Sequence, residues 1–382
     1  MMMKKLSFIL MALIVAGVFV SCNHGQGSLT DAKQQAVAKQ YVEHTITPTY
    51  KNLAAQTEQL VLDLKQLKEN RTQANLNKAC ETFLEARSWW EKSEAFLYGA
   101  ASDFGIDPHI DSWPLDADAF QTMMSNTAQI MAMDSEDGDV YAGEKLGNSL
   151  LGFHGIEYIL FAEGAPKNAD QLTDLEMIYA VAVAGDLRNR CYQLEVSWIG
   201  NEAPANHIAK VEELELNHTV NGSGYSYGDN MLKAGQAGST YASSVAALMA
   251  IVDGCATIAD EVGTSKIGKP FHGEDVSYIE SPYSHKSIVD FYDNIISIEN
   301  AYMGGVAGQR DASKSLYHYV SKFDAGLADR VTTAITEAEQ AIQNMKAPFV
   351  SNYTDASAGA AIDACMKLTD VLDELQMELR KQ

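Results

Sequence analysis

Residues 150–161 read LLGFHGIEYILF. Apolar side chains fill this stretch, and its two ionisable groups, His154 and Glu157, stand three residues apart. In an α-helix that spacing places both groups on one face, one turn from each other, where they can share a hydrogen-bond network or a metal ion. A glycine inside a helix costs about 1 kcal/mol relative to alanine. Gly152 and Gly155 therefore indicate that another backbone or a ligand approaches this face closely.

Helical periodicity extends outward from this stretch through most of the chain. No segment shows the apolar–polar alternation of a half-buried strand. Asp116 is a candidate N-cap, and Thr173 with Glu176 has the spacing of a capping box. The expected helices cover residues 31–70 (with a kink or a new start at Pro48), 72–99, 116–133, 144–161, 173–199, 241–262, 287–303, 313–345 and 357–381. The pattern predicts an all-α protein of two packed helical-bundle domains, and the similar helix ends at 93–99 and 298–304 suggest an internal duplication.

The N-terminus reads as a targeting segment. Lys4 and Lys5 precede a short apolar run that ends at Ser21-Cys22, which indicates a lipoprotein signal peptide over 1–22 with Cys22 as the lipidated residue. We expect a flexible tether over 23–30, an N-terminal bundle over 31–216 and a Gly- and Asn-rich linker or loop over 217–240. A C-terminal bundle over 241–382 completes the predicted organisation.

Charge and cysteine usage narrow the class of protein. The formal net charge of −23 argues against a nucleic-acid partner, because lysine and arginine supply the affinity for phosphates. It also argues against lying directly on anionic lipid. Besides Cys22, the four cysteines at 80, 191, 255 and 365 allow three disulfide pairings, but their apolar helical surroundings favour free, buried thiols.

Three further groups of polar residues could line a site. Arg87, Trp90 and Glu94 share one helix face, as either a covered salt bridge or a carboxylate oriented by arginine. A seam of short polar side chains at 287, 290, 294 and 297 predicts a sheltered interface between the domains, opposite His154. Acidic residues including Asp116 surround Trp113, where turn-capping is the simpler explanation.

Several stretches together resemble the imelysin-like family. Residues 152–157 match its Gly-x-His-x-x-Glu signature, and RSWWEKSEAF at 87–96 is similar to its Arg-x-x-Trp-x-x-Ser-Glu-x-Phe helix. IDSWP at 110–114 resembles the turn that follows. DGC at 253–255, ADEVG at 259–263 and SPYS at 281–284, continuing through Asp290 and Asn294, are similar to a lipoprotein branch of the family found in gut-type bacteria. The resemblance covers the chain from about Tyr41 onward.

The resemblance implies an envelope protein associated with iron uptake. It is expected to be anchored to the outer membrane through its lipid, to face the periplasm or the cell surface, and to meet an iron-uptake partner. It would bind iron (or zinc), or an iron-bearing ligand, between its domains. His154, Glu157 and Glu94 are the expected metal ligands. The lining residues would be Arg87, Trp90, Trp113, Asp116, Ser284, Asp290 and Asn294.

Two alternatives remain open at this point. The family has been labelled a peptidase family, so a metallopeptidase is one. However, the chain has no His-Glu-x-x-His pair of zinc ligands. The other is a metal-free interaction protein in which His154 and Glu157 form a structural lock. If they bind metal, binding should weaken as pH falls through the ordinary titration range of histidine, near pH 6.5.

Overall fold

The structure, a computed structural model, describes residues 24–382 of the chain, with side chains described from Thr30 onward. The predicted signal peptide and the Cys22 anchor lie outside these residues. No helix between 24 and 382 is both long and apolar enough to cross a membrane.

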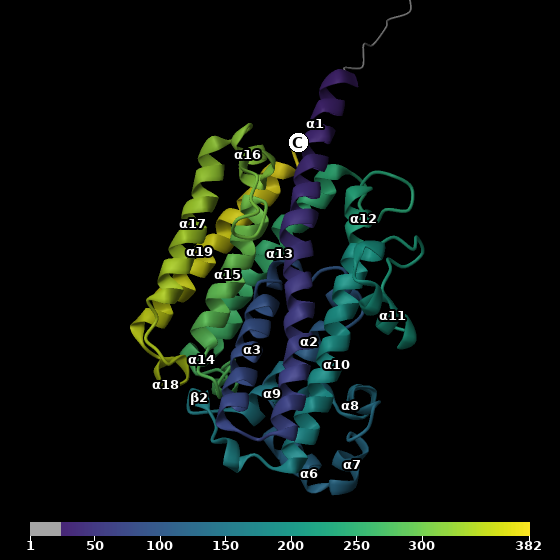
Figure 1. Ribbon diagram of the computed structural model, residues 1–382. Coiled ribbons are helices and arrows are strands. Elements are labelled where there is room, and N and C mark those ends of the chain that lie inside the picture. Colours follow the sequence, from purple (N-terminus) through teal and green to yellow (C-terminus); the bar gives the residue numbers. More distant parts are fainter. Residues whose placement is uncertain (1–23) are drawn as a thin grey trace, which may run out of the picture.

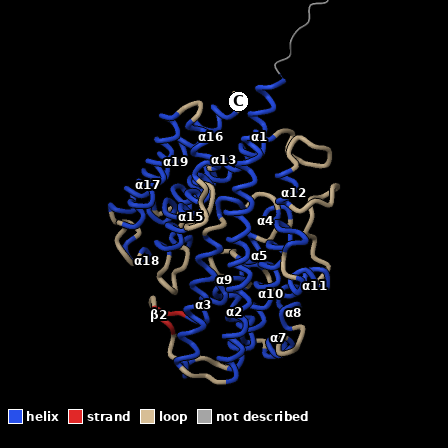
Figure 2. The backbone as a smooth tube through the Cα atoms, turned by 45° about the horizontal axis from the view of Figure 1, so that its top comes forward, coloured by secondary structure: helices blue, strands red, loops and turns tan. Residues whose placement is uncertain are grey.

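Helices dominate the described residues, as predicted. The first half contains α1 (His24–Tyr41), α2 (Thr47–Glu69), α3 (Gln73–Glu91), α4 (Ala100–Asp103), α5 (Asp107–Ile110), α6 (Ala117–Ser125), α7 (Thr127–Ala132), α8 (Gly138–Lys145), α9 (Gly152–Leu160), α10 (Asp174–Ile199), α11 (Ala205–Glu213) and α12 (Tyr227–Leu232). The second half contains α13 (Ser244–Glu261), α14 (Gly268–His272), α15 (Ser287–Met303), α16 (Leu316–Ser321), α17 (Ala325–Gln343), α18 (Phe349–Asn352) and α19 (Ala356–Leu379). The strands described are β1 (Phe161–Ala162) and β2 (Ala165–Pro166), a minimal antiparallel pair (Figure 2).

Two groups of long helices lie side by side (Figure 1). In the first half α2 packs against α3 and α10, and in the second half α19 packs against α13 and α17. The halves meet where α1 packs on α13 and α3 packs on α15. A single apolar core runs through both halves, with Trp90, Phe153 and Phe291 among its largest buried side chains. The contact between α3 and α15 positions the candidate site.

Each half contains one π-helical turn, and each is followed by a proline. The turn η1 (Val42–Ile46) joins α1 to α2 just before Pro48, and η6 (Val262–Ile267) joins α13 to α14 just before Pro270. Proline has no N–H to give to the carbonyl four residues earlier, and its ring pushes that carbonyl aside. At Pro48 the displaced carbonyl is that of His44, which accepts a hydrogen bond from Val306 N at 2.8 Å.

Several predicted boundaries differ from those observed. The helix expected over 144–161 is two helices, because Leu151 is extended and Gly152 has a φ of 66°. The helix expected over 72–99 ends at Glu91, followed by the 3₁₀ turn η2 (Glu94–Phe96). The helix expected over 313–345 divides at Asp324, whose side chain caps α17. The segment 217–240 contains α12.

The local capping predictions are confirmed. Asp116 accepts a hydrogen bond from Ala119 N, and Thr173 forms a complete capping box with Glu176. The four cysteines among the described residues are free and buried, as favoured from their surroundings.

Candidate metal centre between the two halves

Ionisable side chains from both halves meet in the buried region where α3 faces α15. We call this group the interface cluster. Six carboxyl groups and three cationic side chains belong to it, and each is at most 7% exposed. Its members are Arg87, Glu91, Glu94, Asp111, His154, Glu157, Lys266, Glu280 and Asp290.

Arg87 is the central cation of the interface cluster. Its guanidinium lies 2.6 Å from Glu91 Oε1, one turn along α3, and 2.5 Å from Glu280 Oε1 in the second half. It also pairs with Asp111, which accepts a further hydrogen bond from Trp90 Nε1 at 2.6 Å. Among the described ion pairs, Glu94 of the predicted face pairs with Lys266. Arg87 does form a covered salt bridge, but with Glu91 on its own helix. Its partners include two carboxylates that local spacing does not indicate.

Lys266 is the second permanent cation. The π-helical turn η6 carries its ammonium into the cluster, where it lies 3.3 Å from Glu280, 3.6 Å from Glu91 and 3.8 Å from Glu94. It also lies 5.3 Å from the centre of the Trp113 ring, in cation–π contact. Three acids around one buried lysine keep its pKa well above the ordinary value, despite the opposing effect of burial.

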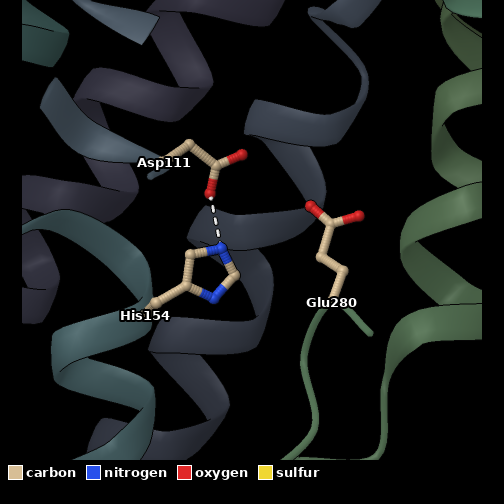
Figure 3. A group of neighbouring side chains, drawn as sticks. All are labelled: Asp111, His154 and Glu280. Atoms are coloured by element: carbon tan, nitrogen blue, oxygen red, sulfur yellow. Dashed lines mark ion pairs between the residues drawn. The ribbon is translucent and has the colours of Figure 1, made fainter. Parts of the chain in front are cut away.

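His154 lies between two carboxylates. Its Nε2 is 3.1 Å from Asp111 Oδ1, an ion-pair distance although the ring is not aligned for a good hydrogen bond, and its Nδ1 is 3.6 Å from Glu157 Oε2. Figure 3 shows the Asp111 pair, with the carboxylate of Glu280 beside it. Burial alone would lower the pKa of His154, but Asp111 and Glu157 raise it to about 9. The imidazole is therefore protonated at neutral pH in the ion-free cluster.

Glu157 ties the first half to a loop of the second. Its Oε1 accepts hydrogen bonds from Ser284 Oγ at 2.7 Å, Ser284 N at 2.8 Å and Tyr283 N at 3.2 Å. Ser281 in the same loop has a φ of 48°, a conformation that side chains rarely adopt. Among the described residues, no donor forms a hydrogen bond with Glu157 Oε2. One oxygen of Glu157 therefore holds the loop, and the other faces His154.

The two glycines of the signature permit close packing around α9. A β-carbon on Gly152 would overlap the carbonyl of Ile110, immediately before Asp111, and one on Gly155 would overlap the hydroxyl of Tyr179. The expected close approach is thus made by protein atoms. It brings the end of α5 against the start of α9 and so places Asp111 beside His154.

The polar seam of α15 is buried and faces the first half. Asn294 donates to Glu91 Oε2 at 2.6 Å, and Ser297 accepts from the backbone N–H of Ala95 at 3.0 Å. Ser281 donates to Asp290, and Ser287 donates to the carbonyl of Glu280. The seam therefore lies at the contact between the two halves, as its short side chains indicated.

The charge balance of the interface cluster is negative even with His154 protonated. Six carboxyl groups face three cations, so some carboxyl groups must keep protons or attract a further cation. Burial raises the pKa of Glu91 and Glu94 well above the ordinary value, and raises that of Asp290 to about 7. Burial would also raise the pKa of Asp111, but Arg87 beside it holds that pKa well below its usual range.

The donor atoms are chemically suited to a metal ion. Asp111, His154 and Glu280 each offer a ligand atom, and these atoms lie within 4.8 Å of one another. Glu91, Glu94 and Asp111 form a second such group. Carboxylate oxygens with one imidazole nitrogen suit iron, manganese or zinc. Because Arg87 and Lys266 already neutralise part of this charge, a metal ion would compete with them and with protons.

A pocket of about 300 Å³ reaches His154 from the surface. Its walls include Trp113, Pro114, Ile279 and Tyr283, so it is largely apolar with a cationic imidazole at its inner end. Trp113 is fixed by a hydrogen bond from its Nε1 to the carbonyl of Tyr278 at 3.1 Å. This pocket connects His154 with the surface of the described part of the chain.

The structure brings together most of the residues singled out from the sequence. His154, Glu157, Glu94, Arg87, Asp290 and Asn294 lie in or against the interface cluster, with Trp90, Trp113 and Ser284 in contact with its members. Asp116 is exposed and caps α6, outside the cluster. Sequence reasoning missed Lys266 and Glu280 and treated Asp111 as a turn residue. A usable signal for Asp111 was its place beside Trp113 in the IDSWP turn.

Comparisons with known proteins agree on one family. The imelysin family profile matches residues 46–375. Iron-regulated protein A of Synechococcus elongatus is 26% identical over 370 residues, which cover 96% of this chain and 90% of that protein. The structure is similar to a Parabacteroides distasonis protein named as an iron-regulated protein A precursor, with a TM-score of 0.77 and 26% identity over 91% of this chain and 95% of that one.

A more distant structure shares the fold. The imelysin-like protein from Psychrobacter arcticum has a TM-score of 0.60 and 12% identity, over 89% of this chain and 93% of that one. At this identity the likeness concerns the helical architecture alone.

Proposed function

The chain belongs to the imelysin family, and from that premise we propose that it is an envelope lipoprotein of iron acquisition that binds an iron ion in the interface cluster. Asp111, His154 and Glu280 would hold the ion, with Glu94 and Glu91 as the second group of donors. Glu157, first expected to be a ligand, would orient His154 and hold the loop that carries Glu280.

One observation carries this proposal, namely the excess of buried carboxyl groups. A purely structural network gains most when its charges balance, because unpaired buried charge is costly. Here six carboxyl groups surround three cations. A divalent cation would supply part of the missing positive charge and take the place of protons held in the cluster, among them the proton of His154. Two similar proteins are named for regulation by iron. Those names describe the relatives, and the likeness to them supports iron as the ion in our proposal.

The cellular setting follows from the predicted anchor. Lipidation at Cys22 would attach the chain to the outer membrane, facing the periplasm or the cell surface, where it would pass iron to or from an uptake partner. The metallopeptidase alternative would require chelator-sensitive cleavage of a denatured protein substrate. The structural-lock alternative is favoured by the contact of both His154 nitrogens with carboxylates.

Calorimetric titration with Fe²⁺ under anaerobic conditions tests the proposal. The wild-type protein should bind one equivalent of iron and melt at a higher temperature when loaded. The His154→Ala variant should lose binding at least tenfold, because it removes one of few ligands. Binding should strengthen between about pH 7 and 9, since the imidazole must lose a proton whose pKa is about 9. The range near pH 6.5 applies to an unperturbed histidine, and Asp111 and Glu157 move the expected range upward.

His207 provides the matched control. It is also buried and paired with a carboxylate, with Nδ1 2.5 Å from Glu195, but it does not belong to the interface cluster. His207→Ala should lower the melting temperature and leave iron binding unchanged. Equal iron affinity in wild type and His154→Ala would contradict the proposal. A wild type that binds no iron, together with a sharp loss of stability in His154→Ala, would establish the structural lock instead.

A further inference from the structure

A second pocket, far from the interface cluster, lies between the start of α1 and α16. Its volume is about 320 Å³. Lys33 and Thr30 of α1 lie on one side, and Lys314, His318 and Lys322 lie on the other. Val37 and Phe323 belong to the apolar part of the lining, and Ser313 and Gln382 add two polar residues. We call this cavity the basic pocket.

The basic pocket is unusual in so acidic a chain. Three of the 28 lysine and arginine residues gather around one cavity in a protein of net charge −23. Lys314 is partly neutralised by Asp311, 2.9 Å away. Among residues 24–382, no carboxylate forms an ion pair with Lys33 or Lys322, and both side chains are exposed. Two unpaired cations beside an apolar floor suit an amphiphile with an anionic head.

The position of the basic pocket relative to the predicted anchor indicates which ligand it binds. Figure 1 shows α1 extending beyond the bundle at the end of the molecule where α16 lies, and α1 packs on α16. His24 to Thr30 is helical and rises about 9 Å, and two more residues, at most roughly 7 Å long, reach Cys22. A lipid at Cys22 would therefore keep Thr30, at the edge of the basic pocket, within roughly 16 Å of the membrane, which is about two Debye lengths.

We propose that the basic pocket binds the phosphate-bearing headgroup of an anionic lipid in the membrane that anchors the chain. Lys33 and Lys322 would pair with the phosphate, and the apolar floor would cover the start of the acyl chains. The chain as a whole carries a net charge of −23 and would be repelled, so the molecule would stand with α1 toward the membrane. The interface cluster and its pocket would then be held away from the lipid. The proposal depends on the predicted anchor and is independent of iron binding.

Hydrogen exchange on the lipidated mature chain in nanodiscs tests this proposal. Discs of phosphatidylcholine alone are compared with discs containing about one-fifth phosphatidylglycerol. Exchange in residues 313–323 should slow at least about threefold in the anionic discs. The double variant Lys33→Gln/Lys322→Gln should remove this slowing, because each lysine near an anionic surface contributes appreciably to binding.

The controls separate the headgroup from other causes. Lys65→Gln/Lys78→Gln changes two exposed lysines outside the pocket and should keep the slowing. Inorganic phosphate added to phosphatidylcholine discs should have no effect, and protection by it would assign the pocket to free phosphate instead. Equal slowing in the Lys33/Lys322 variant, or its loss in the Lys65/Lys78 variant, would overturn the proposal. So would a mature chain that is not retained on the discs, because the pocket would then have no adjacent membrane.

Discussion

His154 illustrates how neighbours decide what a side chain can do. A histidine in water is mostly neutral at pH 7 and ready to ligate a metal. Between Asp111 and Glu157 its pKa rises to about 9, so in the absence of an ion it serves as a cation of the network. A metal ion must therefore replace a proton, and the affinity for metal and the stability of the ion-free protein should respond to pH in opposite directions.

The first residue-scale prediction concerns stability and pH. Because the folded pKa of His154 exceeds its ordinary value of 6.5, its stabilising contribution is complete below pH 6.5 and is lost as pH rises through about 9. This contribution is on the order of 3 kcal/mol. Urea unfolding of wild type and His154→Gln from pH 6 to 10, without metal, should show the difference in free energy of unfolding shrinking as pH rises. A difference that stays constant would contradict the pairing.

Asp290 gives a second residue-scale prediction, with a pH dependence of the same sign but a different cause. Burial raises its pKa from 3.8 to about 7, so the folded carboxyl holds a proton that the unfolded one releases. Stability is therefore lost as pH rises from about 4 to 7. Asp290→Asn cannot ionise and can still accept the hydrogen bond from Ser281. Its melting temperature should fall less than that of wild type between pH 5 and 8, and parallel melting curves would refute the assigned titration.

At the scale of elements, the contact between α5 and α9 depends on Gly152. Its φ of 66° disfavours other residues, and a β-carbon there would overlap the carbonyl of Ile110. Gly152→Ala should lower the free energy of unfolding by at least about 2 kcal/mol. Gly147→Ala is the matched control, because Gly147 has a φ of −77° and nothing within 4 Å of the added carbon. Chemical denaturation should find that variant within about 1 kcal/mol of wild type, and equal losses in both would show that the contact is not tight.

Sequence reasoning succeeded where the signal was local. Helical periodicity predicted the all-α fold, Thr173 marked a helix start, and Gly152 indicated a close approach that the structure contains. Lys266 and Glu280 escaped notice because their partners lie far away along the chain, as with Arg87 and Glu280 at 193 residues apart. Lys266 also depends on the π-helical turn before Pro270, which helical periodicity does not predict.

At the scale of the whole molecule, the two halves share one apolar core and one charged cluster. Neither half can therefore separate without exposing apolar surface and unpairing buried ions. We expect unfolding of the described chain to be a single cooperative transition. The first turns of α1 project beyond the bundle and lead toward the predicted anchor at Cys22 (Figure 1).

The prediction at this scale concerns that anchor. Cys22→Ser should leave the precursor unprocessed or release it as a soluble form, because the thiol is the proposed attachment point for lipid. Fractionation of cells, with extraction of membranes by detergent, measures the distribution of the chain. Cys80→Ser changes a buried cysteine of α3 and should leave that distribution unaltered. If the Cys22→Ser chain still fractionated with lipid as tightly as wild type, the lipoprotein prediction would be wrong.

The hydrogen bonds from residues 283 and 284 to Glu157 bear on how fast a bound ion would leave the protein. Glu280, with no exposed surface, comes from the same loop, and three hydrogen bonds to one carboxylate oxygen keep that loop closed over the cluster. Unless it left through the pocket beside His154, an ion bound beneath this loop would leave only when the loop opened. The residence time of the ion and its affinity would then be set by different parts of the protein. A partner that moved the loop aside could take the ion quickly from a protein that otherwise releases it slowly.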